Sequence, residues 1–439
     1  MDQNTLKTLL VYNPWIENPE VWEDSVNTHM PQAHGFSYIN RFADAMPSWP
    51  QSRKINLIVG PRQCGKSTLM WHTGAGFGPE LIYINGNELG FREWCTSPAM
   101  FLADLQKITS QPKVLFFEEV QYLENAGLFL KGLVDLQYNM MIFATGSSSF
   151  HLHDKIRESM AGRVQRLTLY PFSLSEWAGD KNTQPSAIYE KKALEKFDRM
   201  VIFGSYPEAC FSDKPDLILN SLVESFVIRD ASDIFRIKYP AKFRKLLSLM
   251  ASQIGNLVNF SDWASICGLD IKTTESYANI LEESHIIKLL PPYTGGKRAE
   301  IISSPKIFFI DNGIRNLMIH QFNDFEVRAD KGVLFENWLF SELIKNSGYN
   351  DFLYFWRSKG GAEVDFVRQH GDLLEAFEAK AGPMKRPKLS RSAHSFIDAY
   401  SPAFFYVVNL NLRHETVIGK TTVMWLTHLD FIDILGRSY

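Results

Sequence analysis

Short apolar runs alternate with amphipathic segments between residues 54 and 171. They predict five strands: one in the run that starts at residue 54, and four at residues 81–85, 113–120, 140–147 and 163–171. Helices are predicted between them near residues 98–108 and 128–137. Strands that alternate with helices are typical of a parallel sheet covered on both faces, so this part is predicted to have an α/β fold.

A different pattern begins near residue 240, where short amphipathic helices precede two short strands. The helices are predicted at residues 243–252, 261–266 and 273–283, and the strands at residues 286–293 and 306–310. This order resembles a winged helix, whose third helix normally enters a DNA groove. That helix, however, carries Lys272 against three glutamates, Glu275, Glu282 and Glu283, whereas a reading helix should attract phosphates. A packing or dimerisation module is therefore the favoured alternative.

The last part of the chain predicts a second mixed α/β domain. A helix is expected near residues 333–345, followed by strands at residues 353–357, 362–368 and 373–380. A helix near residues 389–399 and two apolar strands, 403–410 and 422–427, complete it. The order helix, three strands, helix, strand matters because of the polar residues that these elements carry.

Composition narrows the class of protein without adding chemistry. The chain has 439 residues, too many for one core, with 45% hydrophobic and 22% charged residues, as in ordinary globular proteins. No apolar run approaches the ~18 residues of a membrane span, so no membrane partner is expected. The first residues lack the pattern of a signal peptide, and the four cysteines suggest no disulfide framework. We therefore expect a cytoplasmic protein.

A phosphate-binding loop is the clearest chemical signal in the sequence. Residues 54–70 read KINLIVGPRQCGKSTLM, an apolar run that ends in G-x-x-x-x-G-K-S. Gly60 and Gly65 let the backbone wrap around phosphates, Lys66 neutralises the β/γ-phosphates, and the Ser67 hydroxyl can coordinate Mg²⁺. The predicted ATP-contacting residues are Gly60, Pro61, Arg62, Gln63, Cys64, Gly65, Lys66, Ser67 and Thr68.

Two acidic residues follow the loop by about 50 positions, at the end of the strand KVLFFEEVQ. Ligands of such sheets bind at the carboxyl ends of the strands. Glu118 is expected to hold the Mg²⁺ shell, and Glu119 to orient and deprotonate the attacking water. An exposed acidic strand end is the alternative, which the preceding loop disfavours.

Further candidates of the nucleotide site lie downstream. In MIFATGSSS, Thr145 or Ser147 could sense the γ-phosphate, against the alternative of an ordinary Gly–Ser turn. In AGRV, Arg163 could stabilise transition-state charge as an arginine finger, in its own subunit or in a neighbour's. A finger that acts on a neighbour would require a homo-oligomer.

These motifs together resemble a prokaryotic family of AAA-type ATPases that carries a C-terminal domain of unknown function. GPRQCGKSTL, FFEEVQ, ATGSSS, AGRV and YPFSLSEW carry the resemblance, which continues through FGSYPEA, SPKIFFIDNGI, LFENWLFSEL and FWRSKGGAEVDF. The chain departs from the family at Glu118, where Asp is usual, and at Cys64, where an aliphatic residue is usual. The longer Glu118 side chain moves the carboxylate by ~1.5 Å, so we expect its contact with the Mg²⁺ shell, and with it the hydrolysis rate, to differ from that of the family.

The C-terminal strands carry a second set of candidate residues. Asp365 falls on the second strand, and Glu378 and Lys380 form an E-x-K on the third, where residues i and i+2 share one face. Asp365 and Glu378 could hold Mg²⁺, Lys380 could activate water, and Glu336 could complete the acidic shell. Glu363 could assist Asp365. In this element order the set resembles the core of PD-(D/E)xK nucleases; a solvated hairpin with scattered charges is the alternative.

The resemblance implies an ATPase core, a helical and winged-helix middle and a restriction-endonuclease-like end. The expected segments are an N-terminal extension (1–50), the AAA-type ATPase domain (51–178), a helical linker or lid (179–240), a winged-helix-like domain (241–325) and a nuclease-like domain (326–439).

Two classes of function follow from this organisation. One is an ATP-driven, Mg²⁺-dependent enzyme that acts on DNA, in which basic residues at Lys385, Arg386, Lys388 and Arg391 would receive the phosphate backbone. A second basic run lies at Arg236, Lys238, Lys242, Arg244 and Lys245. The other class is an ATP-driven regulatory switch with a degenerate nuclease-like domain, which Glu118 and the net charge of −3 favour.

Overall fold

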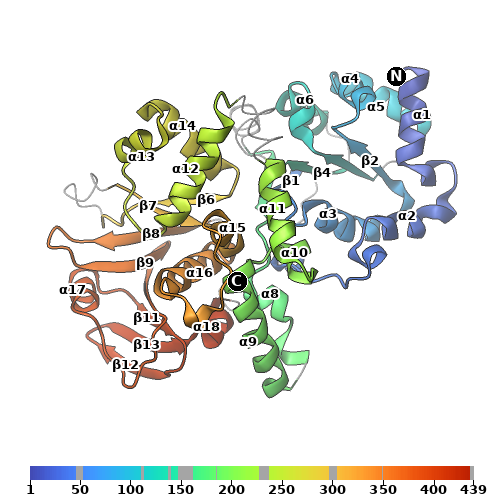
Figure 1. Cartoon of the computed structure of the whole chain (residues 1–439). Coiled ribbons are helices and arrows are strands. Elements are labelled where there is room, and N and C mark those ends of the chain that lie inside the picture. The colour runs from blue at the N-terminus through green and yellow to red at the C-terminus, as the bar shows by residue number, and fades with distance from the viewer. Residues whose placement is uncertain are drawn as a thin grey trace. The chain divides into compact units, whose positions relative to one another are not determined.

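The computed structural model describes residues 1–45, 53–109, 113–136, 140–146, 162–183, 185–226, 237–295, 304–348 and 350–435. The chain forms two compact units, Met1–Tyr170 and Pro171–Tyr439 (Figure 1). Among the described residues, no helix combines the length and apolar character that a membrane span requires.

A five-stranded parallel sheet organises the first unit. Its strands are β1 (Ile55–Val59), β2 (Leu81–Asn85), β3 (Val114–Glu118), β4 (Met141–Gly146) and β5 (Val164–Thr168), in the order β2-β3-β4-β1-β5. The apolar strands β1 to β4 are almost wholly buried, the edge strand β2 included, as in a sheet that is covered on both faces. The predicted α/β fold with a parallel ATPase-type sheet is thus confirmed.

Two hydrophobic cores cover the two faces of this sheet. On β1, Ile55, Leu57 and Val59 pack into one core and Ile58 into the other, because successive strand residues point to opposite faces. The first core receives α4 (Leu89–Trp94), α5 (Pro98–Ile108) and α6 (Ala126–Asp135); the second receives α2 (Trp22–Thr28) and α3 (Lys66–Gly74). The predicted helix at residues 98–108 coincides with α5.

The N-terminal segment packs on the same unit. It comprises α1 (Gln3–Tyr12), α2 and the short helices η1 (Pro14–Ile16), η2 (Pro19–Val21), η3 (Pro31–His34) and η4 (Phe42–Ala45). The Asn13 amide donates to the Tyr83 carbonyl at 2.9 Å, and the Trp15 indole donates to the Leu81 carbonyl at 2.7 Å. Both carbonyls belong to the edge strand β2, so these side chains satisfy an edge that would otherwise be unpaired.

The second unit begins with helices. In chain order they are α8 (Leu174–Ala178), η7 (Lys181–Thr183), α9 (Ser186–Phe203), α10 (Pro207–Phe211), α11 (Pro215–Ser225), α12 (Pro240–Ser252), α13 (Phe260–Cys267) and α14 (Ile271–Glu283). An antiparallel ribbon of β6 (Ile287–Leu290) and β7 (Lys306–Phe309) follows, and then α15 (Asn312–Met318) and η10 (Phe325–Val327). Helices α11 to α15 and the ribbon share one core. The predicted helices and strands of this region exist; that they act as a winged helix stays a prediction.

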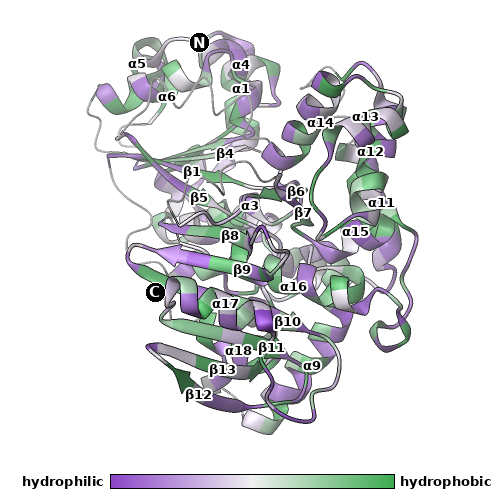
Figure 2. Cartoon of the chain, turned by 90° about the vertical axis from the view of Figure 1, so that its left-hand side faces the viewer, coloured by the Kyte–Doolittle hydropathy of each residue, from purple (hydrophilic) through white to green (hydrophobic). Residues whose placement is uncertain are grey.

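A six-stranded mixed sheet forms the C-terminal part. Its elements are α16 (Lys331–Lys345), β8 (Asp351–Arg357), β9 (Glu363–His370), β10 (Leu373–Lys380), α17 (Arg391–Tyr400), β11 (Phe404–Asn409), β12 (His414–Ile418), β13 (Thr421–Thr427) and α18 (His428–Leu435). The strand order is β12-β13-β11-β10-β9-β8, and Figure 2 shows this stack. Strands β8 to β10 pair antiparallel, whereas β11 pairs parallel with β10 and β13.

Aromatic contacts show how helices cover this mixed sheet. Phe396 of α17 lies 5.3 Å from Trp356 of β8 between ring centroids. Phe431 of α18 lies 6.0 Å from Phe377 of β10, and Phe340 of α16 lies 6.1 Å from Phe366 of β9. The sheet therefore presents the carboxyl end of β10 and the neighbouring part of β9 next to helix α16, where the predicted acidic residues lie.

Candidate functional site

The loop between β1 and α3 has the backbone conformation that a phosphate loop requires. Gly60, Gln63 and Gly65 have positive φ angles of 148°, 57° and 98°. A Cβ on Gly60 would lie 2.0 Å from the Leu169 carbonyl oxygen, so no other residue fits there. The loop hence lies against the end of β5 and leads straight into the first turn of α3.

Lys66 begins α3 and is buried, with 6% of its surface exposed. Its ammonium donates to the carbonyl oxygens of Gly60, at 3.1 Å, and Pro61, at 2.7 Å. These bonds hold a positive charge over the loop. The cation is therefore already placed where an anion on the loop would meet it.

Ser67, Glu118 and Tyr83 form a hydrogen-bonded group at the carboxyl end of the sheet. The hydroxyls of Ser67 and Tyr83 each donate to one oxygen of the Glu118 carboxylate. Burial and the Glu118 charge raise the pKa of the Tyr83 hydroxyl, which keeps it neutral and donating. Hydroxyl and carboxylate oxygens are the ligand types that Mg²⁺ prefers, so this donor set fits the predicted metal.

Glu119 follows Glu118 at a bend that ends β3. Its φ is +54°, a strained value for a residue other than glycine. Its backbone N–H donates to the buried Thr145 hydroxyl at 3.2 Å, and its carboxylate accepts from the Gln121 amide. The structure thus brings Glu118, Glu119 and Thr145 together at one edge of the sheet. Ser147 lies outside the described residues.

The remaining predicted loop residues occupy the turn and the first turn of α3: Pro61, Arg62, Gln63, Cys64 and Thr68. Cys64 is buried, and its thiol donates to the Leu169 carbonyl at 3.1 Å. Burial raises the pKa of this thiol, so it stays protonated and acts as a small packing residue.

Arg163 does not join this group. It precedes β5, and the register pairs Ile55 with Val164, so Arg163 lies at the amino edge of the sheet. The phosphate loop leaves the opposite edge, about 20 Å further along the strand direction. Arg163 instead donates to Asp135 at 2.6 Å. The strand register therefore contradicts the prediction that Arg163 is an arginine finger for the ATP site of its own subunit. A finger role in a neighbouring subunit stays a prediction.

A second polar group gathers the predicted C-terminal residues. Asp365 of β9 accepts from the backbone N–H of Ala379 at 2.8 Å. On β10, the Glu378 carboxylate accepts from Ser390 at 2.6 Å and pairs with the Lys380 ammonium at 3.1 Å. Burial lowers the pKa of Lys380, but the carboxylates of Glu378 and Asp365 outweigh it and raise the pKa overall. Lys380 is therefore a cation at neutral pH.

Lys306, which sequence reasoning missed, enters the same group from β7. It is 3% exposed, pairs with Glu363, and lies 3.6 Å from the carboxylate of Glu336 on α16. Burial and the charge of Asp365 raise the pKa of Glu336 to about 8. Burial likewise raises the pKa of Asp365. The sequence does not single out Lys306, because it begins a short apolar strand, β7, and belongs to no motif.

We call these six residues the acid–lysine cluster: Lys306, Glu336, Glu363, Asp365, Glu378 and Lys380. Within the described part of the chain, no three His, Cys, Asp or Glu side chains are grouped as a metal site would require. The cluster thus contains the predicted residue types, but its carboxylates are engaged by lysines, a serine and a backbone N–H.

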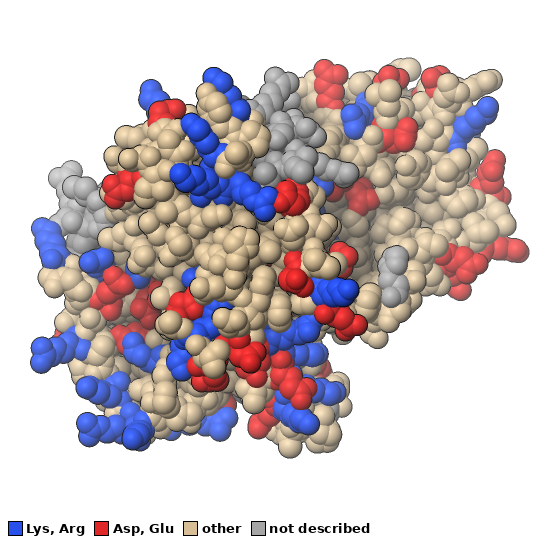
Figure 3. Space-filling model, viewed as in Figure 1, with Lys and Arg blue, Asp and Glu red and all other residues tan. Residues whose placement is uncertain are grey.

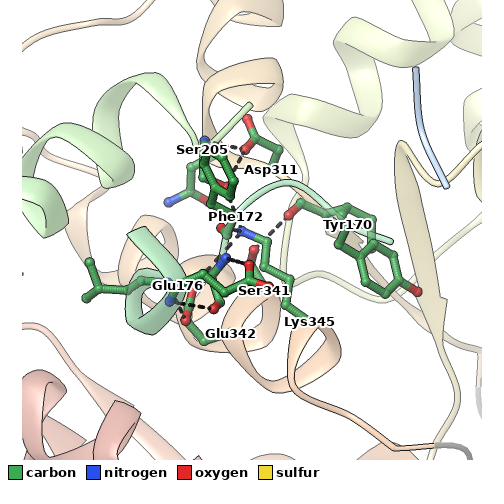
Figure 4. A network of polar contacts seen from close by, with 12 residues as sticks. Tyr170, Phe172, Glu176, Ser205, Asp311, Ser341, Glu342 and Lys345 are labelled. Atoms are coloured by element: carbon green, nitrogen blue, oxygen red, sulfur yellow. Dashed lines mark hydrogen bonds and ion pairs between the residues drawn. The ribbon is translucent and has the colours of Figure 1, made fainter. Parts of the chain in front are cut away.

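The motifs that follow the ATPase region meet in a buried polar network (Figure 4). Asp311 accepts from the backbone N–H of Ser205 at 2.7 Å, and Lys345 donates to the Ser205 hydroxyl at 2.8 Å. Glu342 of α16 accepts from the N–H of Leu174 at 3.0 Å. A Cβ on Gly204 would lie 1.9 Å from an Asp311 oxygen, which explains the glycine. The network fastens the start of α8 and the turn after α9 to α16.

Three family models match separate parts of the chain. Residues 52–178 match an AAA domain, residues 194–324 match a domain of unknown function (DUF8612), and residues 331–429 match a domain of unknown function (DUF4143). The AAA match covers the phosphate loop, the acidic strand end and the parallel sheet.

Similar proteins occur in bacteria and archaea. An uncharacterized protein of Haemophilus influenzae is 24% identical over 72% of this chain and 80% of its own length. Others from Methanocaldococcus jannaschii and Mycobacterium tuberculosis are 24% and 25% identical, over 72% and 78% of this chain and 72% and 73% of their own lengths.

Solved structures with partial similarity include AMPPCP-bound DnaA from Aquifex aeolicus. It is 12% identical with a TM-score of 0.23, over 52% of this chain and 82% of its own. A yeast Hsp104–casein complex is 12% identical with a TM-score of 0.24, over 62% of this chain and 52% of its own. The family model, by contrast, matches an AAA domain over residues 52–178, which contain the phosphate loop, and this match supports an AAA-type ATPase that binds ATP.

Proposed function

We propose that this chain hydrolyses ATP in a Mg²⁺-dependent reaction and couples ATP to an action on DNA. The observation that carries the ATPase proposal is the group of Lys66, Ser67, Glu118 and Glu119 at one edge of the parallel sheet. Each of these side chains would have a defined task in phosphoryl transfer, and the hydrogen bonds that hold them at this edge of the sheet support the proposal.

The proposed roles follow from the contacts. Lys66 exchanges the carbonyls of Gly60 and Pro61 for phosphate oxygens, and Ser67 with Glu118 would hold Mg²⁺, which neutralises phosphate charge when bound. Glu119 orients the attacking water and accepts its proton at a carboxylate oxygen. The Thr145 hydroxyl holds the backbone of Glu119 and so sets where that carboxylate points.

A Glu119→Gln variant tests the ATPase proposal. It should keep ATP affinity and lose most hydrolysis, because the amide retains the shape but cannot accept the proton from water. The readouts are phosphate release and ATP binding on the same preparation. Hydrolysis of ATP at the wild-type rate in Glu119→Gln would contradict the assignment of Glu119 as the base.

The action on DNA is proposed for the second unit. Asp365, Glu378 and Lys380 converge beside Glu336, and the exposed cations Lys385, Arg386, Lys388 and Arg391 follow β10 directly. The Met384 segment that carries them is tied to Asn411 by two hydrogen bonds of 3.0 and 2.9 Å. In Figure 3, Lys and Arg also gather over α12 and around α17 and β12. Exposed cations that directly follow a strand of the acid–lysine cluster support contact with a phosphate backbone.

Two chemistries are proposed for the acid–lysine cluster. Its oxygens are of the type that Mg²⁺ prefers, which favours metal-dependent cleavage with Lys380 steering the water. Lys306 favours the second candidate, a switch that does not cleave, because its buried ammonium already neutralises Glu363 and approaches Glu336. In that case ATP changes shape and partner binding while the C-terminal part only binds.

A cleavage assay distinguishes the two candidates. Branched, single-stranded and duplex DNA are incubated with Mg²⁺ or Mn²⁺, with and without ATP, using the wild type and Lys380→Ala, Asp365→Ala and Glu378→Ala. Cleavage that the variants lose supports the nuclease. Cleavage that persists equally in all three variants means a contaminant. DNA retention without cleavage supports the switch, and neither retention nor cleavage on any DNA contradicts an action on DNA.

A further inference from the structure

We infer that Arg41, in the N-terminal segment, is a positioning residue of the phosphate loop and a second cation of the ATP site. This inference rests on the proposed binding of ATP. It gives residues 36–45 a role in the ATPase although they lie outside the region 52–178 that matches the AAA domain.

Arg41 ties the loop to the segment that leaves β5. Its side chain is buried, with 6% of the residue exposed. One nitrogen, Nη1, donates to the Cys64 carbonyl at 2.9 Å, and the other, Nη2, donates to the Tyr170 carbonyl at 2.6 Å. A planar guanidinium holds two acceptors at a fixed spacing, which a lysine ammonium cannot do. Arg41 therefore fixes the distance between the phosphate loop and the end of β5.

The bond to the Cys64 carbonyl also orients a donor for phosphate. In a planar trans peptide, the carbonyl and the following N–H point in opposite directions. While Arg41 holds the Cys64 carbonyl, the N–H of Gly65 must point away from Arg41. Gly65 directly precedes α3 and has a φ of 98°. The N–H groups at such a helix start are the donors that bind phosphate, so Arg41 sets the direction of one of them.

Arg41 adds positive charge to the site as well. Burial raises the pKa of the Cys64 thiol, and the charges of Lys66 and Arg41 both act to lower it. Both cations are thus close enough to act on the middle of the loop. ATP carries several negative charges, which two buried cations attract more strongly than one.

The N-terminal segment holds Arg41 in place through a turn attached to α3. The Asp44 carboxylate accepts from the backbone N–H of Arg41 at 2.7 Å and from the Tyr38 hydroxyl at 2.9 Å. The Tyr38 ring stacks on His72 of α3, with ring centroids 3.8 Å apart and an interplanar angle of 18°. Ala43 is buried in the core that also contains Leu69 and Trp71 of α3. The turn is therefore anchored on the helix whose start binds phosphate.

The test measures ATP affinity by calorimetry for the full chain and its variants. Arg41→Ala removes the guanidinium group with its bonds to the Cys64 and Tyr170 carbonyls, whereas Arg41→Lys keeps the positive charge. Asp44→Ala removes the exposed carboxylate that holds the turn and replaces no buried side chain. Arg199→Ala is the matched control, because Arg199 in the second unit also donates to backbone carbonyls, those of Ala209 and Ser212. Lys66→Ala reports on ATP binding at the phosphate loop itself.

We expect Arg41→Ala to weaken ATP binding at least about tenfold, Arg41→Lys and Asp44→Ala to weaken it less, and Arg199→Ala to match the wild type. Guanidinium chloride at a non-denaturing concentration should restore part of the affinity of Arg41→Ala, and sodium chloride at equal ionic strength should not. A purely structural defect would not respond to this rescue.

Each other outcome has a definite meaning. Wild-type affinity in Arg41→Ala, with affinity lost in Lys66→Ala, overturns the role of Arg41 and leaves the ATPase proposal intact. Absent ATP binding in the wild type overturns the ATPase proposal instead. If Arg41→Ala does not fold, Asp44→Ala decides, because unchanged affinity in that variant also overturns the role of Arg41.

Discussion

A single methylene group distinguishes Glu118 from the aspartate that the family resemblance implies at this position. The longer side chain lets one carboxylate accept from both Ser67 and Tyr83, two hydroxyls on different elements. The sequence identified Glu118 and Ser67 as partners, because their motifs are specific. It did not identify Tyr83, because a tyrosine in a buried strand has no signature until the sheet order places it beside β3.

Replacing Glu118 by aspartate tests whether the hydrogen bonds of Ser67 and Tyr83 to the Glu118 carboxylate limit the rate of ATP hydrolysis. The shorter side chain withdraws the carboxylate by ~1.5 Å from the two hydroxyls. We expect a higher rate of ATP hydrolysis in Glu118→Asp, because the Ser67 hydroxyl no longer needs to leave the carboxylate before it reaches the metal. Steady-state phosphate release measures this, with Tyr83→Phe as a control that frees one oxygen only. A lower rate in Glu118→Asp would show that the glutamate is the adapted residue.

At the scale of elements, the sequence predicts strands best in two cases. In one, both faces of the strand are buried; in the other, buried apolar residues alternate with more exposed ones along the strand. Strand β10 has the predicted bounds, and β1 to β4 follow from their apolar runs. Strand β12 was missed, because His414–Ile418 is short and mostly exposed at the edge of the sheet. The sequence indicates no role for the N-terminal segment, because its contacts with β2 and the phosphate loop join residues that are distant in the chain.

Helix α16 links two polar groups, since it carries Glu336 in the acid–lysine cluster and Glu342 in the buried network. Burial raises the pKa of Glu342 to about 7, against about 4.3 in an unfolded chain. The folded state therefore binds a proton that the unfolded state releases. This contribution to stability is complete below about pH 4.3 and is lost as the pH rises through about 7.

A Glu342→Gln variant should remove this pH dependence. Between about pH 5 and pH 8, the wild type should lose about 2–3 kcal/mol more unfolding free energy than the variant. Urea unfolding of both proteins at the two pH values measures the difference. Parallel loss of stability in the two proteins would mean that Lys345, 3.9 Å from Glu342, keeps the carboxylate ionised throughout.

At the scale of the whole molecule, the position of Arg163 matters for assembly. The strand register places it at the amino edge of the sheet, away from the phosphate loop of its own chain. The sequence places Arg163 at the start of the predicted strand 163–171 but leaves both options open, because it does not show that this strand pairs in parallel with β1, the strand that leads into the phosphate loop. If Arg163 acts as a finger, the ATP that it contacts belongs to another subunit.

This arrangement predicts that ATP promotes self-association. Arg163→Ala should keep ATP affinity and abolish turnover, because only the transition-state contact is lost. Light scattering across a range of ATP concentrations, together with turnover at each protein concentration, checks both points. Full activity in a strictly monomeric protein would exclude a finger from a neighbour and leave Arg163 as the partner of Asp135 only.

Binding of ATP at the phosphate loop is the claim on which the other proposals depend. Lys66 is buried and its ammonium is held by two loop carbonyls, so its loss should remove a charge contact worth ~1.5–3 kcal/mol. Calorimetric titration of ATP with Mg²⁺ into the wild type and Lys66→Ala is the most direct measurement. We predict binding to the wild type and at least about tenfold weaker binding to the variant. Equal affinity for the two proteins would contradict the account.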